Sequence, residues 1–187
     1  LRKKHAPDLV IANAENLAHG KGITLRTINF MIDAGVDFFT SGNHVFDKPE
    51  AKVVFEKFAS RIIRPANLPG NLPGAGVKLI SVKGQPVLML NLLGQVFMEK
   101  QFDQGEISNP FTTLQEILAS RGQEARIKIL DFHAEATSEK RGMGFWADGQ
   151  LSAVLGTHTH IPTADAQILA GGTGYQTDLG MTGAADS

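Results

Sequence analysis

Two histidines one residue apart, His158 and His160, close the apolar run LSAVLG within the string GTHTH. On an extended backbone, side chains two residues apart point to the same side. The pair could therefore present two imidazole nitrogens to one cation, and neutral imidazole is the commonest metal ligand. For these five residues alone, a polar strand end that binds nothing is an equal alternative.

Three other apolar runs also end in residues that can bind a metal. Glu15 and Asn16 follow DLVIAN, Asn43 and His44 follow VDFFTSG, and His133 ends RIKILDFH. A single histidine after a strand is more often a hydrogen-bonded structural residue. The carboxyl ends of parallel strands converge on one edge of a sheet, the usual place for a site in α/β proteins. Four such endings in one chain favour a shared metal site.

The elements that must position these residues alternate between extended and helical patterns, which predicts an α/β fold with mixed sheets. Thr24 is a candidate N-cap, and Lys83-Gly84-Gln85 is typical of a hairpin turn. Strands are expected at 8–13, 36–42, 62–67, 77–82, 86–93, 126–134, 151–156 and 174–178, and helices at 24–34, 49–59, 110–120 and 137–149.

Composition narrows the classes of function. The chain has 187 residues, 42% of them hydrophobic, a net charge of −1 and no cysteine. A near-neutral net charge does not suggest a basic surface, so no stable nucleic-acid complex is expected, and no apolar run is long enough for a membrane span. The lack of cysteine excludes disulfides and thiolate ligands and fits a cytoplasmic location. A chain that begins at Leu1 and ends at AADS is expected to be cut at both ends.

The motifs G-N-H at 42–44 and G-x-H-x-H at 156–160, with His133 between them, resemble the calcineurin-like metallophosphoesterase superfamily. The strings ANAENLAHGKGIT, TSGNHVFD, NLLGQVFME, DFHAEATSEK and GTHTHIPTADAQIL are similar, more specifically, to the bacterial YmdB-type phosphodiesterases. The resemblance implies a four-layer αββα sandwich with mixed sheets. It also implies one domain over 1–187 that lacks the family's first strand and its C-terminal elements.

The resemblance further implies two divalent metal ions, iron or manganese or both. By that analogy Glu15 bridges the two ions. Asn43, His133 and His158 complete one metal, and Asn16 and His160 help to hold the other. An amide ligand binds through its carbonyl oxygen and adds no charge, which keeps the ions electrophilic.

His44 follows a ligand without being one, and the resemblance assigns it the catalytic role beside the leaving group. Histidine as a residue type titrates near neutral pH, which suits general acid catalysis. The implied nucleophile is a metal-bound hydroxide, and the implied substrate is a small phosphodiester such as a cyclic nucleotide. Family members are often oligomeric, so a homo-oligomer is expected.

Four more residues are weaker candidates around the site. His19, in a glycine-flanked loop, would shape substrate access or be solvated. Glu135 and Thr137 would orient an imidazole; alternatively, Thr137 caps the next helix and Lys140 is solvated. Tyr175 would border the pocket or belong to the core.

One departure keeps other interpretations open. The family's first motif, G-D-x-x-G, supplies a metal-binding aspartate and is not found in this sequence. A regulatory protein that keeps the metal site without useful turnover, or an inactive fragment, is therefore the alternative to an enzyme. A TIM-barrel amidohydrolase is disfavoured, because its H-x-H lies near the chain start and a barrel needs about 250 residues.

Overall fold

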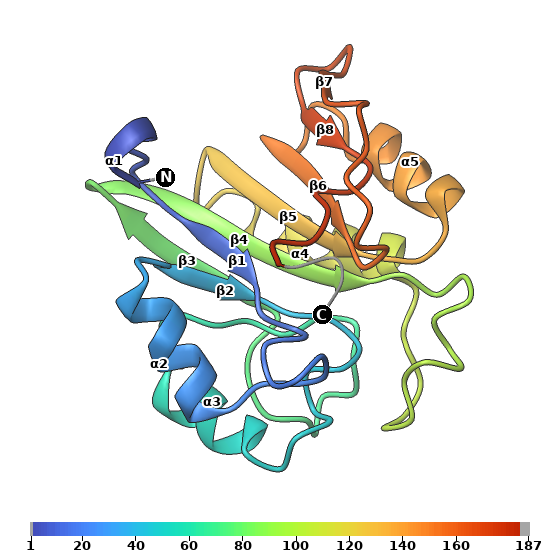
Figure 1. Ribbon diagram of the computed structural model, residues 1–187. Coiled ribbons are helices and arrows are strands. Elements are labelled where there is room, and N and C mark those ends of the chain that lie inside the picture. The colour runs from blue at the N-terminus through green and yellow to red at the C-terminus, as the bar shows by residue number, and fades with distance from the viewer. Residues whose placement is uncertain (1, 184–187) are drawn as a thin grey trace.

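The computed structural model describes residues 2–183 and alternates short helices with strands from end to end (Figure 1). The helices are α1 (Arg2–His5), α2 (Leu25–Asp33), α3 (Ala51–Lys57), α4 (Pro110–Arg121) and α5 (Thr137–Trp146). The strands are β1 (Ile11–Asn13), β2 (Phe38–Thr40), β3 (Val77–Val82), β4 (Gln85–Leu93), β5 (Ile127–His133), β6 (Ala153–Thr157), β7 (Gln167–Ile168) and β8 (Gly174–Gln176).

The strands form two sheets. In the smaller sheet β1 pairs in parallel with β2. The larger sheet has the order β3-β4-β5-β6-β8-β7, in which β4, β5, β6 and β8 run parallel and the two edge strands, β3 and β7, run antiparallel to their neighbours. The parallel register places Leu93, His133 and Thr157 side by side at the carboxyl ends of β4, β5 and β6.

Three apolar clusters separate four layers. Helices α2 and α3 cover the small sheet through residues such as Ile28, Val54 and Phe39. Between the sheets, Phe38 packs with Met89. The two helices α4 and α5 cover the far face of the large sheet through a third cluster that includes Leu114, Leu130, Phe132 and Met143. The order is therefore helix, sheet, sheet, helix, and this confirms the expected αββα sandwich (Figure 1).

Alternation along β4 explains how one strand serves two layers. Val87 and Met89 face the small sheet, whereas Leu88, Leu90 and Leu92 face the helices. Successive strand residues point to opposite faces, so a strand buried on both sides is apolar throughout. That is why PVLMLNLL reads as an almost unbroken apolar run.

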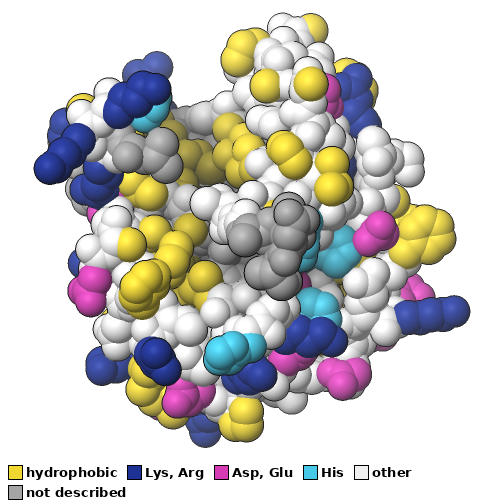
Figure 2. All heavy atoms as spheres, viewed as in Figure 1, with side chains coloured by type: hydrophobic (Ala, Val, Ile, Leu, Met, Phe, Trp, Pro, Cys, Tyr) yellow, Lys and Arg dark blue, Asp and Glu magenta, His cyan; other side chains and the backbone are white. Residues whose placement is uncertain are grey.

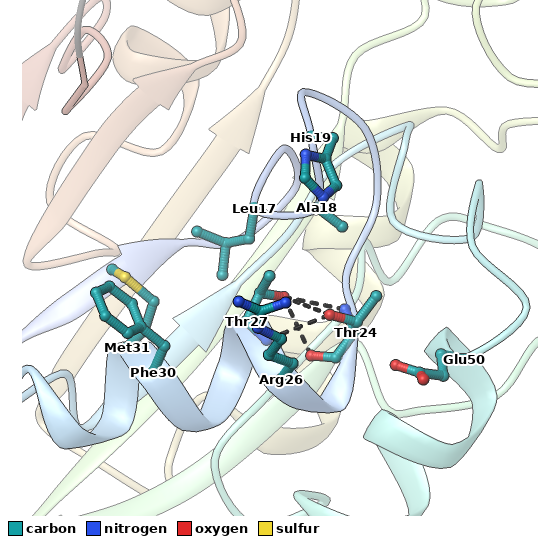
Figure 3. A pocket seen from close by; sticks show the side chains of 9 residues that line it. All are labelled: Leu17, Ala18, His19, Thr24, Arg26, Thr27, Phe30, Met31 and Glu50. Carbon is teal, nitrogen blue, oxygen red and sulfur yellow. Dashed lines mark hydrogen bonds between the residues drawn. The ribbon is translucent and has the colours of Figure 1, made fainter.

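Most expected elements are present, several of them shorter than expected. The strand expected at 62–67 is wrong: within that range only Ile62 pairs, in an isolated parallel bridge with Phe39. Thr24 caps α2 and forms a capping box with Thr27, drawn as dashed lines in Figure 3. Both turn residues of the β3–β4 hairpin, Lys83 and Gly84, have positive φ angles of 50° and 82°, which two-residue turns of this type need. Strand β7 was not expected, because its two residues are too few for a periodic pattern. Among the described residues, no helix has the length and apolar character to cross a membrane.

Candidate metal centre

The four polar strand endings meet at one edge of the two sheets. Strand β1 ends at Asn13 and β2 at Thr40, so Glu15 and Asn43 lie in the loops that follow them, whereas β5 ends at His133 itself and β6 ends directly before His158. On the face drawn in Figure 2, histidine side chains gather near the centre, beside both basic and acidic side chains. The convergence follows from the parallel pairing of β1 with β2 and of β5 with β6.

Four side chains from these strand ends converge on one point. The Nε2 of His133 lies 2.9 Å from Glu15 Oε2, 3.0 Å from Asn43 Oδ1 and 3.1 Å from His158 Nδ1. The ligand atoms of Glu15, His133 and His158 all lie within 4.8 Å of one another. Glu15, Asn43 and His133 are buried, so the group is held by the fold.

These four side chains, from Glu15, Asn43, His133 and His158, are called the first group. Their arrangement fits a bound cation better than a network of hydrogen bonds. Its atoms nearest His133 Nε2 are a carboxylate oxygen, an amide oxygen and a ring nitrogen, and a single proton on Nε2 cannot satisfy all three. His158 Nε2 lies 2.7 Å from Glu135 Oε2. If Nε2 donates there, Nδ1 keeps its lone pair for the shared point.

The pKa shifts of the ionisable residues in the first group are consistent with a cation site. Burial alone would raise the pKa of Glu15, but His133 and the His44 peptide N–H lower it to about 2. Burial disfavours the charged form of His133, yet the neighbouring carboxylates, Glu15 first, raise its pKa above the ordinary value. Burial and then the His133 charge lower the pKa of His158. A proton on His133 is thus what an incoming cation would displace.

Asn16 and His160 form a second pair outside the first group. The Asn16 Nδ2 lies 3.0 Å from His160 Nε2. The other amide atom, Asn16 Oδ1, is buried without a hydrogen-bond partner among the described residues. A buried amide oxygen without a donor is costly, and a cation bound there would supply its missing partner.

The two histidines of GTHTH do not lie on extended backbone, so the geometry expected from their spacing is wrong. Strand β6 ends at Thr157, and His158 and His160 have φ angles of +104° and +66°. Positive φ is uncommon outside glycine and concentrates at functional sites. The two rings consequently reach different partners, His133 and Asn16 respectively.

His44 lies beside the first group and opens onto solvent. Its peptide N–H donates to Glu15 Oε1 at 3.0 Å, and its ring Nδ1 lies 2.9 Å from Asp47 Oδ2. The ring lines a polar hollow of about 440 Å³, whose walls are Lys21, His44, Asp47, Lys100, Gln101 and Asp103. Within the part of the chain that the structure describes, neither Lys21 nor Lys100 forms an ion pair.

Of the four weaker candidates, one contacts a candidate ligand and three lie elsewhere. Glu135 contacts the His158 ring, as an orienting partner would. His19 is exposed and lines a different hollow, of about 640 Å³, between its own loop and α2 (Figure 3). Thr137 is exposed and is the first helical residue of α5; the cap position belongs to Ala136, which makes no side-chain cap. Tyr175 lies in the core rather than at a pocket, because β8 turns its ring toward Gly144 of α5.

Two buried polar residues near the site were not predicted. Asp131 lies on β5 two residues before His133 and is 7% exposed. Lys140, for which a solvated side chain was one of the two alternatives, is 1% exposed, and its Nζ lies 2.7 Å from Asp178 Oδ2. The same oxygen accepts from Thr159 N at 3.1 Å and Thr159 Oγ1 at 2.8 Å, which holds the loop between the two histidines. A charged residue inside the apolar run RIKILDFH was the available signal for Asp131.

Gly42 allows the backbone after β2 to approach the His133 ring. An added Cβ there would overlap the ring, and even the third-nearest ring atom, Cδ2, would be 2.6 Å away. A glycine at this position is therefore required for Asn43 Oδ1 to reach the imidazole. The first residue of the G-N-H motif has a steric reason in this structure.

Comparisons with known proteins agree with the geometry. The chain is 41% identical over 186 residues to a 2',3'-cyclic-nucleotide 2'-phosphodiesterase from Bacillus subtilis strain 168; the match takes in 100% of this chain and 68% of that protein. Two curated relatives from Mycoplasma, 39% and 38% identical, are covered over 64% of their length. The chain thus spans about two thirds of the length of the curated relatives it matches.

Solved structures give the same relationship. A hypothetical protein from Thermus thermophilus has a TM-score of 0.88 at 42% identity, over 97% of this chain and 68% of that one. A novel phosphatase from Mycoplasma pneumoniae has a TM-score of 0.86 at 38% identity, over 96% of this chain and 63% of that one. A 5'-nucleotidase from Candida albicans, at 17% identity and a TM-score of 0.57 over 94% of this chain and 37% of that one, shares the metallophosphoesterase fold alone.

A sequence profile of the family described as YmdB-like protein matches residues 1–187. The profile covers the whole chain and each strand end that carries a candidate ligand. Together with the identity to the curated relatives, it shows that the chain belongs to the YmdB-like protein family.

Proposed function

We propose that this chain is the catalytic part of a metal-dependent phosphodiesterase acting on cyclic nucleotides or related small phosphodiesters. The observation that carries the proposal is the convergence of Glu15, Asn43, His133 and His158 on one point, with His44 beside it. The curated relative from Bacillus, named for 2',3'-cyclic nucleotides, supports the substrate class.

The chain's residues would hold two divalent cations, with iron and manganese as the expected metals. Asn43, His133 and His158 would bind one, while Asn16 and His160 would bind the other, and Glu15 would lie between them. The partnerless Asn16 Oδ1 supports the second set, among the residues that the structure describes. When bound, such cations lower the pKa of a coordinated water toward about 7 and offset the charge that develops at phosphorus.

His44 would protonate the leaving group. As the phosphorus–oxygen bond breaks, the leaving oxygen takes a proton from His44 Nε2, while Nδ1 stays in contact with Asp47 Oδ2. The carboxylate would orient the ring, as a carboxylate does for a catalytic histidine. Lys21 and Lys100 line the hollow in front of His44 and would attract the anionic substrate.

The test is hydrolysis of bis-p-nitrophenyl phosphate and of 2',3'-cyclic AMP by metal-stripped protein, with and without added Mn²⁺. Activity should depend on the metal, and hydrolysis of 2',3'-cyclic AMP should fall about a hundredfold or more in His44→Ala, as the loss of a general acid implies; bis-p-nitrophenyl phosphate, whose leaving group departs without a proton, should lose less. His5→Ala, on the exposed helix α1, is the matched control and should leave activity unchanged. Mn²⁺ binding without hydrolysis of either ester would contradict the proposal and favour a regulatory binding protein.

A further inference from the structure

Asp131 joins the two sheets directly beneath the candidate metal centre. Its Oδ2 accepts a hydrogen bond from Asn13 Nδ2 at 2.9 Å and another from Thr40 Oγ1, both on the small sheet. Its Oδ1 accepts from Thr157 Oγ1, on strand β6 of the large sheet, at 2.7 Å. A carboxylate buried in this way is costly unless its oxygens are hydrogen-bonded, and here both oxygens are.

The Thr157 hydroxyl determines which ring nitrogen of His133 carries a proton. The hydroxyl has one proton. If that proton is donated to Asp131, the same oxygen can only accept from His133 Nδ1, which lies 2.9 Å away. His133 then carries a proton on Nδ1, which leaves Nε2 as the nitrogen that can bind a cation at the point shared with Glu15, Asn43 and His158.

Asn13 connects the same carboxylate to Glu15. The side-chain oxygen of Asn13 accepts from the Glu15 peptide N–H at 3.0 Å, which fixes the orientation of the amide. Its nitrogen must therefore be the atom that donates to Asp131. One buried carboxylate thus holds the backbone of one candidate ligand and the ring of another.

We infer that Asp131, acting through Thr157, is a positioning residue that holds His133 in the Nδ1–H form and so commits Nε2 to the metal. The inference rests on the metal site proposed above. It adds a requirement which that site alone does not contain: the Thr157 hydroxyl must donate to Asp131 and accept from the histidine. Outer partners of this kind typically change metal affinity by about 10- to 100-fold.

Thr157→Val tests the inference, because valine keeps the β-branched shape and removes only the hydroxyl. Mn²⁺ binding to the metal-stripped protein is measured by calorimetry, and the midpoint of metal-free thermal unfolding is measured in parallel. Thr173→Val is the matched control. The buried Thr173 hydroxyl lies away from the site, donates to Leu151 O at 2.7 Å and accepts from Gly149 N at 2.9 Å.

The expected result is a Mn²⁺ dissociation constant about 10- to 100-fold higher in Thr157→Val, near the wild-type value in Thr157→Ser, and unchanged in Thr173→Val. Two-bond ¹⁵N–¹H spectra of the Zn²⁺-loaded wild type should show His133 protonated at Nδ1. Wild-type affinity in Thr157→Val, or a proton-free Nδ1, would overturn the inference. Failure of the wild type to bind Mn²⁺ would instead overturn the proposed metal site.

Discussion

Replacing Lys140 by methionine should destabilise the protein far more than a surface charge deletion would. Lys140 and Asp178 are each 1% exposed, and their charged atoms are 2.7 Å apart. Methionine keeps most of the apolar stem but leaves the Asp178 carboxylate buried without its cation. Removing one partner of a buried ion pair costs about 3–5 kcal/mol.

The contacts that Asp178 retains place the expected cost at the lower end of that range. The carboxylate would still accept from Thr159 N, Thr159 Oγ1 and, at 2.8 Å, Gly180 N. We therefore expect a loss of about 3 kcal/mol. For a chain of this size, each kcal/mol shifts the midpoint by about 2–4 °C, which gives a decrease of roughly 6–12 °C.

Thermal and urea unfolding of the metal-free protein measure this loss. Lys83→Met is the control, because Lys83 pairs with Asp8 at the surface, where the two side chains are 75% and 56% exposed. Such pairs contribute less than about 1 kcal/mol. The double variant Lys140→Met/Asp178→Asn should lose less than the sum of its single variants, because it leaves no unpaired charge. The reasoning is refuted if Lys140→Met costs no more than Lys83→Met.

Three further predictions concern Gly42, the loss of stability at acid pH through Asp178, and the lysines Lys21 and Lys100. Gly42→Ala should cost about 1–3 kcal/mol by overpacking and abolish Mn²⁺ binding in calorimetry, whereas Gly70→Ala, whose added Cβ meets nothing within 4 Å, should do neither. Burial tends to raise the pKa of Asp178, but the bond from Lys140 and the other donors lower it below the ordinary value; its contribution to stability is therefore complete above about pH 4 and is lost below it. The deficit of Asp178→Asn in urea unfolding should accordingly be constant above about pH 4 and narrow as the pH falls below it, and a deficit that stays constant below about pH 4 would contradict the assignment. Replacing both Lys21 and Lys100 by alanine should raise KM for bis-p-nitrophenyl phosphate roughly three- to tenfold with kcat retained, as the loss of about 1 kcal/mol implies; an unchanged KM would mean that the hollow does not receive the substrate.

The sequence pattern was sufficient to predict the α/β class and most of the strands, whereas the four layers were implied by the family resemblance. Apolar runs closed by polar residues predicted β1, β2, β5 and β6, and the parallel connections follow from helices between them. Those elements alone bring Glu15, Asn43, His133 and His158 together, although no two of these residues share an element. Topology rather than local pattern therefore accounts for the first group.

Local geometry was predicted less well. The spacing of His158 and His160 suggests an extended backbone, but β6 ends at Thr157, and both histidines have positive φ angles. Lys140 lies on the buried face of α5 with Met143 and Gly144, but its charged residue type suggests a solvated side chain, and the partner that permits its burial, Asp178, lies 38 residues later. Such burial is set by contacts between distant segments, which a periodic pattern does not contain. The cytoplasmic location and the homo-oligomer stay predictions.

The two halves of the candidate site are made at different times on the ribosome. Asn16 and His160 are 144 residues apart, and Asn43 and His133 are 90 apart. A nascent chain that ends before β5 already contains the carboxylate and amide ligands but lacks every histidine of both groups. With the ligands proposed above, a metal would be held only after the second half has emerged and docked through Asp131. Metal content would then measure how completely each chain has been synthesised and folded.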